Sequence, residues 1–216
     1  MIARVIGAAR WLVRLEIGTW RSLFLLVTRR VSGRGPGVLT FSYSRQVAPV
    51  IGAFIFVSLI ELPVVHLLIP WDSVRIAALV VSVWGLLWMI GYLASVKVFP
   101  HLLDADGLRI RFGTTVDIAV PWKAVASVTA RRGSVPDGST VHVDGTEVAV
   151  PVMKQTRVAV SLDRPTTLRL PSGPAEVTEL RFYADDPRGL VAAARECQRN
   201  LPASTSVSSP GGRSDG

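Results

Sequence analysis

The chain has 216 residues, a formal net charge of +8, 49% apolar residues and one cysteine. A single cysteine excludes an internal disulfide framework. Residues 1–45 hold eight Arg and one Glu, whereas residues 97–216 hold fifteen Lys or Arg against thirteen Asp or Glu. Because the basic excess lies beside the most apolar part of the chain, we expect anionic lipid headgroups as a partner and no nucleic acid.

Residues 1–31 are predicted to form a basic amphipathic helix. At about 100° per residue, five of its six arginines gather within an arc of roughly 120°, opposite Trp, Leu and Phe side chains, while Arg30 falls on the apolar side. Such a helix is typical of the membrane interface, and the alternative is a helix that packs on the rest of the protein. The candidate headgroup contacts are Arg4, Arg10, Arg14, Arg21 and Arg29. Residues 32–46, which begin with a Gly-rich run, are predicted to be a linker.

Residues 47–98 predict a transmembrane hairpin with spans at about 47–69 and 74–98. At about 1.5 Å per residue, each span is long enough for a hydrocarbon core of about 30 Å. Fifteen positions of the first span are Leu, Ile, Val or Phe. Each favours insertion by roughly 0.3–0.6 kcal/mol, against an opposing cost of about 3 kcal/mol for Glu61.

The distribution of arginine around the hairpin predicts its orientation. Eight Arg precede the first span, while the turn between the spans offers little beyond Arg75. Positive charge favours the cytoplasmic side, so we expect a multi-pass protein of the cell membrane with both termini in the cytoplasm.

Glu61 and His66 form a candidate intramembrane polar site. An ionisable group inside a span usually faces a polar partner or a watery cavity. The two residues lie about 140° apart on an ideal helix, although Pro63 between them is able to kink it. A buried structural hydrogen bond and an ion or proton site both remain open.

Residues 99–201 predict a β-rich domain that ends in a helix, because alternating apolar and polar runs follow one another between turns. The predicted strands are 99–103, 108–112, 115–120, 124–130, 140–143, 147–150, 157–162, 167–170 and 177–183. Of these, 140–143 and 167–170 are candidates for loops or insertions. An acidic pair and Pro187 open a helix that runs to about Asn200. Residues 202–216 are Ser/Gly/Pro-rich and are predicted to be disordered.

The amino-acid sequences of three segments resemble those of bacterial pleckstrin-homology-like (PH-like) domains. They are residues 103–113 (LDADGLRIRFG), 120–128 (VPWKAVASV) and 180–190 (LRFYADDPRGL). With the upstream hairpin, the chain resembles small membrane-anchored actinobacterial members of that group. The excess of Arg over Lys, 21 to 3, also suggests a GC-rich bacterial genome.

The resemblance implies a membrane-anchored α+β protein with a seven-stranded sandwich or barrel closed by one helix, and it implies a binding module. Phosphoinositide-binding relatives carry a Lys/Arg-rich first hairpin, whereas this turn carries Asp104 and Asp106. Because those carboxylates repel phosphate, we do not transfer headgroup recognition to Arg109 or Arg111.

No catalytic, cofactor or metal site is expected. The sequence has no P-loop, nucleophile elbow or kinase signature, and His101 and His142 lack companions at zinc-ligand spacing. Both histidines are expected at surface or strand positions. Arg131 and Arg132 are predicted to lie on a flexible basic loop, and two interpretations stay open: a loop that is only solvated, or one that contacts the membrane or a protein partner.

Two functions follow as hypotheses. The first is a non-enzymatic, membrane-tethered interaction or scaffolding module that presents a cytoplasmic domain to a protein partner or the inner membrane surface. The second is an ion- or proton-linked transport or sensing subunit that uses Glu61 and His66. The sequence leaves homo-oligomerisation open.

Overall fold

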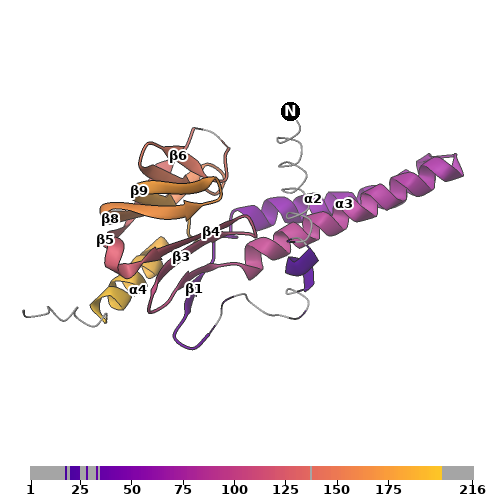
Figure 1. Cartoon of the computed structure of the whole chain (residues 1–216). Helices are drawn as coiled ribbons and strands as arrows, with labels where there is room; N and C mark the ends of the chain where they lie inside the picture. Colours follow the sequence, from indigo (N-terminus) through magenta and orange to yellow (C-terminus); the bar gives the residue numbers. More distant parts are fainter. Residues whose placement is uncertain are drawn as a thin grey trace, which may run out of the picture.

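A computed structural model describes residues 18, 20–24, 28, 33, 35–136 and 138–200. It is an α+β structure with two long apolar helices and two β-sheets (Figure 1). Arg4, Arg10, Arg14, Arg29 and the predicted tail lie outside the described residues. Of the predicted amphipathic helix, residues 18 and 20–24 are described and helical.

The two long helices form a hairpin that extends away from the sheets (Figure 1). Helix α2 spans Val47–Leu68, and α3 spans Asp72–Val98. Asp72 and Arg75 form an ion pair in the first turn of α3. Both helices are long and apolar enough to cross a membrane, and almost none of their most apolar stretches is buried. They are therefore unlike the core helices of a soluble domain, which bury an apolar face.

The first sheet has the strand order β1-β2-β3-β4, and every neighbouring pair is antiparallel. Its strands are β1 (Leu39–Phe41), β2 (His101–Leu103), β3 (Gly107–Phe112) and β4 (Val116–Pro121). The segment 32–46, predicted to be a linker, thus supplies a strand. This strand pairs with β2, although the whole helical hairpin separates the two strands in the sequence. Local periodicity does not reveal a contact between segments so far apart.

The second sheet has the order β5-β8-β9-β7-β6, with one parallel pair, β7 and β9. Its strands are β5 (Val125–Ser134), β6 (His142–Asp144), β7 (Glu147–Val150), β8 (Gln155–Leu170) and β9 (Gly173–Phe182). The predicted strands 157–162 and 167–170 are two halves of β8, which continues past Pro165 through a register shift against β9. Proline is tolerated within a strand at such irregularities.

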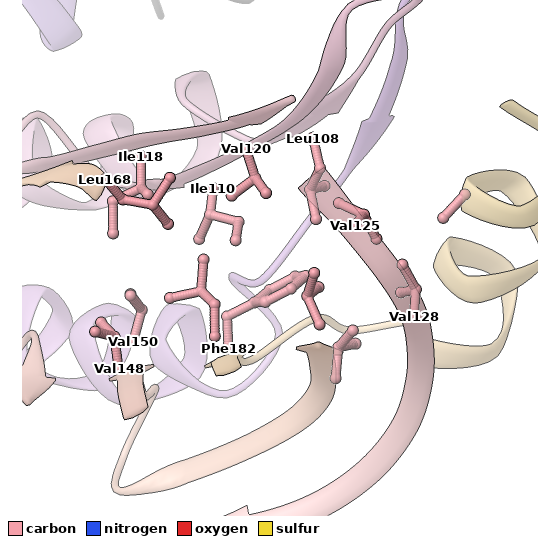
Figure 2. Packing of buried hydrophobic residues seen from close by; sticks show 14 of the residues in the cluster. Leu108, Ile110, Ile118, Val120, Val125, Val128, Val148, Val150, Leu168 and Phe182 are labelled. Atoms are coloured by element: carbon pink, nitrogen blue, oxygen red, sulfur yellow. The ribbon is translucent and has the colours of Figure 1, made fainter. Parts of the chain in front are cut away.

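The two sheets enclose one hydrophobic core and do not close into a barrel. Of the two predicted arrangements, a sandwich and a barrel, the structure is therefore a sandwich. Figure 2 shows Ile110, Ile118 and Val120 of the first sheet facing Phe182 and Val148 of the second. Burying each such side chain stabilises the fold by roughly 1.5–3 kcal/mol. A short 3-10 turn, η1 (Trp122–Ala124), links the sheets.

Helix α4 spans Pro187–Arg199 and covers one end of the core through Leu190, Val191 and Ala194. The Asp186 carboxylate caps the helix by accepting the Gly189 N–H at 2.9 Å. The predicted C-terminal helix is therefore confirmed, including its acidic opening.

Candidate functional site

The base of the helical hairpin packs on the sandwich through a second apolar cluster, which we call the junction cluster. Its buried members are Tyr43, Val47, Val96, Val152 and Tyr183. The cluster takes one residue from the start of α2, one from the end of α3, and the others from segments that adjoin the sheets. The helices and the sheets are thus connected by packed side chains as well as by the chain itself.

Hydrogen bonds reinforce this junction just before α2 begins. The Arg45 N–H donates to both carboxylate oxygens of Asp185 at 3.1 Å, and the Asp185 N–H donates to the Ser42 carbonyl at 2.8 Å. The Gln46 side chain donates to the Gln155 side chain at 3.1 Å. The segment after β1 is therefore held against the C-terminal part of the sandwich.

Tyr43 and His101 form a buried polar pair in the same region. The Tyr43 hydroxyl accepts the Gly113 N–H at 2.6 Å, and burial raises the pKa of this tyrosine. Nδ1 of His101 accepts the Arg111 N–H at 3.1 Å, which leaves Nε2 to donate to the Tyr183 carbonyl at 2.8 Å. Burial lowers the pKa of His101 to about 4. The imidazole is therefore neutral near pH 7, and its two hydrogen bonds give it a structural role.

Arg109 and Arg111 both lie beside Asp117. Arg109 donates two hydrogen bonds to the Asp117 carboxylate, at 2.6 and 2.8 Å, and Nε of Arg111 lies 3.6 Å from the same group. A cavity of about 250 Å³ beside them is lined by Arg21 and Asp117 among others. Arg111 also lines this cavity, so the Asp117 carboxylate already provides its arginines with an anionic partner.

The turn between β2 and β3 is built by its own carboxylate. Asp104 accepts the N–H groups of Asp106 and Gly107 at 2.9 and 3.0 Å. The Asp104 side chain thus stabilises its own turn. With the Asp106 carboxylate beside it, the turn is acidic, which is why we assign no lipid-headgroup binding to it.

The described part of the N-terminal helix touches the first sheet. Ser22 is buried, and a side chain at Gly18 would collide with Thr114 in the turn between β3 and β4. Trp20 and Phe24 on the same helix are exposed. For these residues the structure supports packing on the sandwich while leaving two aromatic rings at the surface.

Glu61 and His66 are both exposed on α2, which runs without interruption through Pro63. Within the part of the chain that the structure describes, no hydrogen bond or ion pair joins them to each other. The structure therefore does not bring this predicted pair together as a site.

Arg131 and Arg132 lie in strand β5 and not on a flexible loop, which corrects the prediction. Ala130 pairs with Val158 and Gly133 pairs with Thr156, so two residues of β5 oppose Arg157 alone on β8. This is a β-bulge, a feature that redirects side chains at functional sites.

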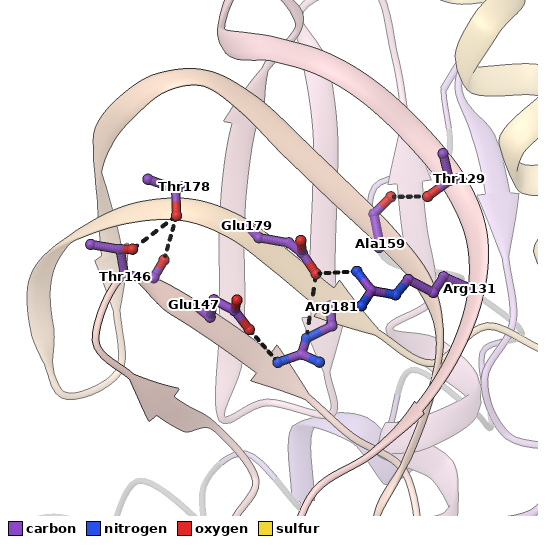
Figure 3. A network of polar contacts seen from close by, with 8 residues as sticks. All are labelled: Thr129, Arg131, Thr146, Glu147, Ala159, Thr178, Glu179 and Arg181. Carbon is purple, nitrogen blue, oxygen red and sulfur yellow. Dashed lines mark hydrogen bonds and ion pairs between the residues drawn. The ribbon is translucent and has the colours of Figure 1, made fainter.

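The two arginines of the bulge have different partners. Arg131 lies 3.4 Å from Glu179, which also lies 3.6 Å from Arg181, and Arg181 donates to Glu147 at 2.5 Å (Figure 3). This chain of alternating charges crosses the second sheet. Arg131 is therefore part of a surface ion-pair network.

Arg132 instead shares a cavity of about 170 Å³ with Arg157 and Arg188. Ala130 and Pro187 complete the lining, so every charged lining residue is an arginine. The Arg157 guanidinium also stacks over the Tyr183 ring, with Cζ 4.9 Å from the ring centroid. We call Arg132, Arg157 and Arg188 the arginine pocket.

Sequence reasoning found one of these three arginines. The Arg131-Arg132 doublet was visible, but its relation to Arg157 depends on the pairing of β5 with β8, and Arg188 joins them from α4. Residues 155–162 alternate as expected of a strand. The alternation does not tell which residues of β5 lie opposite Arg157, and the register of the two strands does.

Among the described residues, no cluster of three or more His, Cys, Asp or Glu is arranged to hold a metal ion. Cys197 is half-buried on α4, and burial raises the pKa of its thiol. A raised pKa lowers the fraction of reactive thiolate.

Comparison of the chain with protein-family models, with curated proteins and with solved structures found no match.

Proposed function

We propose that this protein is a non-enzymatic, membrane-anchored interaction module. In this proposal α2 and α3 span the bilayer, and the sandwich is held at the cytoplasmic surface, where it meets a protein partner. The junction cluster is the observation that carries the proposal. It supports a sandwich held close to the base of the hairpin, because the first residue of α2 and a residue near the end of α3 pack in this cluster.

The exposed surface of the hairpin supports the membrane part of the proposal. Large apolar side chains are exposed along both helices, among them Phe54, Phe56, Leu67, Val80 and Trp84. Each square ångström of apolar surface left in water costs roughly 25 cal/mol. A surface this continuous is typical of contact with lipid or another apolar partner.

The charge distribution supports the orientation. Arg45 lies two residues before α2, and Lys97 is exposed in the last turn of α3, so the base of the hairpin carries basic residues. The opposite turn holds Asp72 beside Arg75. This asymmetry favours a cytoplasmic base.

The PH-like resemblance is part of the same proposal. Two packed sheets with a C-terminal helix over one end are compatible with it. The parallel β7–β9 pair and the nine strands of the described residues depart from the seven strands that the resemblance implies. Binding by the sandwich, in place of catalysis, is what the resemblance suggests.

Cysteine labelling in intact cells tests the anchorage. With Cys197→Ser as background, we expect a membrane-impermeant maleimide to label Trp71→Cys from outside. It should label Asp144→Cys only after the membrane is permeabilised, since both positions are exposed but one lies in the turn between α2 and α3 and the other in β6 of the sandwich.

External labelling of Asp144→Cys would overturn the cytoplasmic assignment. Photo-crosslinking from exposed sandwich positions in the same membranes then tests for the partner. A crosslink pattern that is identical from every face, or absent from all of them, would contradict a specific docking surface.

A further inference from the structure

We propose that the arginine pocket, Arg132, Arg157 and Arg188, binds a phosphate group. The three residues come from β5, β8 and α4, and a bulge, a cross-strand pairing and a helix start bring them to one cavity. The site is separate from the acidic turn at Asp104 and from the cavity that contains Asp117.

The charge of the pocket is the first argument. Three like charges around one small cavity repel each other, and the repulsion grows where the protein partly excludes water. A bound anion relieves this repulsion. Guanidinium groups also match phosphate oxygens with paired N–H donors, which makes arginine the usual residue for this recognition.

Nearby carboxylates are already engaged by the backbone. Asp185 accepts two bonds from the Arg45 N–H, and Asp186 caps α4 through the Gly189 N–H. Neither of them lines the pocket. The arginines are thus not arranged around an internal carboxylate, in contrast to Arg131 with Glu179 or Arg109 with Asp117.

The shape of the pocket is the second argument. A volume of about 170 Å³ exceeds the share of one water in the liquid, about 30 Å³, several-fold. A phosphate group with bound water fits this space. Arg157 is half-buried and held over the Tyr183 ring, so one donor of the site is positioned before a ligand arrives.

The position of the pocket indicates where the phosphate comes from. Arg157 stacks on Tyr183, and Tyr183 packs in the junction cluster with Val47, the first residue of α2. Through Arg157 and Tyr183 the pocket therefore adjoins the junction cluster, which also contains the first residue of the hairpin. If α2 spans the bilayer, a lipid headgroup is the nearest source. This source rests on the proposed function, whereas a free phosphate would need only the pocket.

The test uses the full chain in zwitterionic detergent micelles and native mass spectrometry. The probes are phosphatidylglycerol, phosphatidylcholine and inorganic phosphate, each titrated separately and in competition. We expect phosphatidylglycerol to bind, and Arg157→Gln and Arg188→Gln to weaken it about tenfold each, the loss of one charged hydrogen bond. Arg169→Gln is the matched control, because Arg169 is exposed on the same strand outside the pocket.

The outcomes separate the sources. Competition by inorganic phosphate at similar concentrations, with the same variant pattern, would support the phosphate site with a soluble ligand. Because both lipids carry a phosphodiester, equal binding of phosphatidylglycerol and phosphatidylcholine would overturn the selection of an anionic headgroup. Equal binding of phosphatidylglycerol and of inorganic phosphate by Arg188→Gln and the unsubstituted chain would overturn the site.

Two controls keep the test interpretable. Thermal unfolding of each variant shows whether the sandwich is intact, and Arg188 is exposed, so its loss leaves the core unchanged. Cysteine labelling of the same variants reports the anchorage separately. A failure to bind either phosphatidylglycerol or inorganic phosphate with intact topology refutes the pocket alone, and a reversed topology refutes the cytoplasmic assignment alone.

Discussion

His101 is a residue whose surroundings decide its protonation. It lies in β2, where every residue is buried, because β1 and β3 flank the strand and Tyr43 and Phe182 cover its ring. Both ring nitrogens are used in hydrogen bonds, so the neutral form fits the site and the charged form does not.

We expect this histidine to make stability depend on pH. Its folded pKa of about 4 lies below the ordinary 6.5, so between these values the unfolded chain binds more protons. Stability should fall as the pH drops from about 6.5 to 4, by about 3 kcal/mol, and histidine should add no further loss below that.

Urea unfolding of the full chain in micelles at several pH values measures this effect. His101→Gln, although less stable overall, should show a shallower pH dependence over the same window. Parallel pH profiles for the two proteins would contradict the assignment. His142→Gln is the matched control, because it removes a histidine that lies in β6, away from this site.

The sequence placed His101 at a surface or strand position. The strand is confirmed, but the burial of the His101 ring depends on Tyr43, which precedes the hairpin in the chain, and on Phe182 of β9. Alternation of apolar residues predicts which face of a strand is covered, and it cannot reveal that both faces are.

At the scale of elements, β1 and the residues after it connect the hairpin to the sandwich. Local patterns predicted both long helices, α4 and most strands, since each is encoded within its own segment. They did not predict β1, a strand of three residues that follows a Gly-rich run. The arginine pocket was missed for the same reason, because it depends on pairing between distant segments.

Tyr43 is the residue through which this connection should be tested. Tyr43→Ala should cost about 3–5 kcal/mol, since it empties a fully buried aromatic site. Tyr43→Phe keeps the ring but leaves the Gly113 N–H without its acceptor, so we expect about 1–3 kcal/mol. Urea unfolding in micelles measures both.

Leu39→Ala is the control for these substitutions, because Leu39 lies in β1 and is exposed. Its effect should be small. If Tyr43→Ala were no more destabilising than Leu39→Ala, the segment would not hold the hairpin to the sandwich.

For the whole molecule, the fold combines two surfaces that require different surroundings. The hairpin exposes apolar side chains over most of its length, whereas the sandwich buries its apolar side chains in one core. The junction cluster lies where these two parts meet. Interdomain contacts that are small and polar usually permit relative motion, whereas a packed apolar contact restricts it.

We therefore expect the hairpin and the sandwich to move as one body. Spin labels at Trp71 and Asp144, on a Cys197→Ser background, should give a narrow distance distribution in lipid nanodiscs. The double substitution Val96→Ala and Val152→Ala removes two buried members of the junction cluster and should broaden it. Val143→Ala, at an exposed position of β6, should leave it narrow. A broad distribution in the unsubstituted chain would show that the junction is too weak to hold the sandwich in one orientation relative to the hairpin.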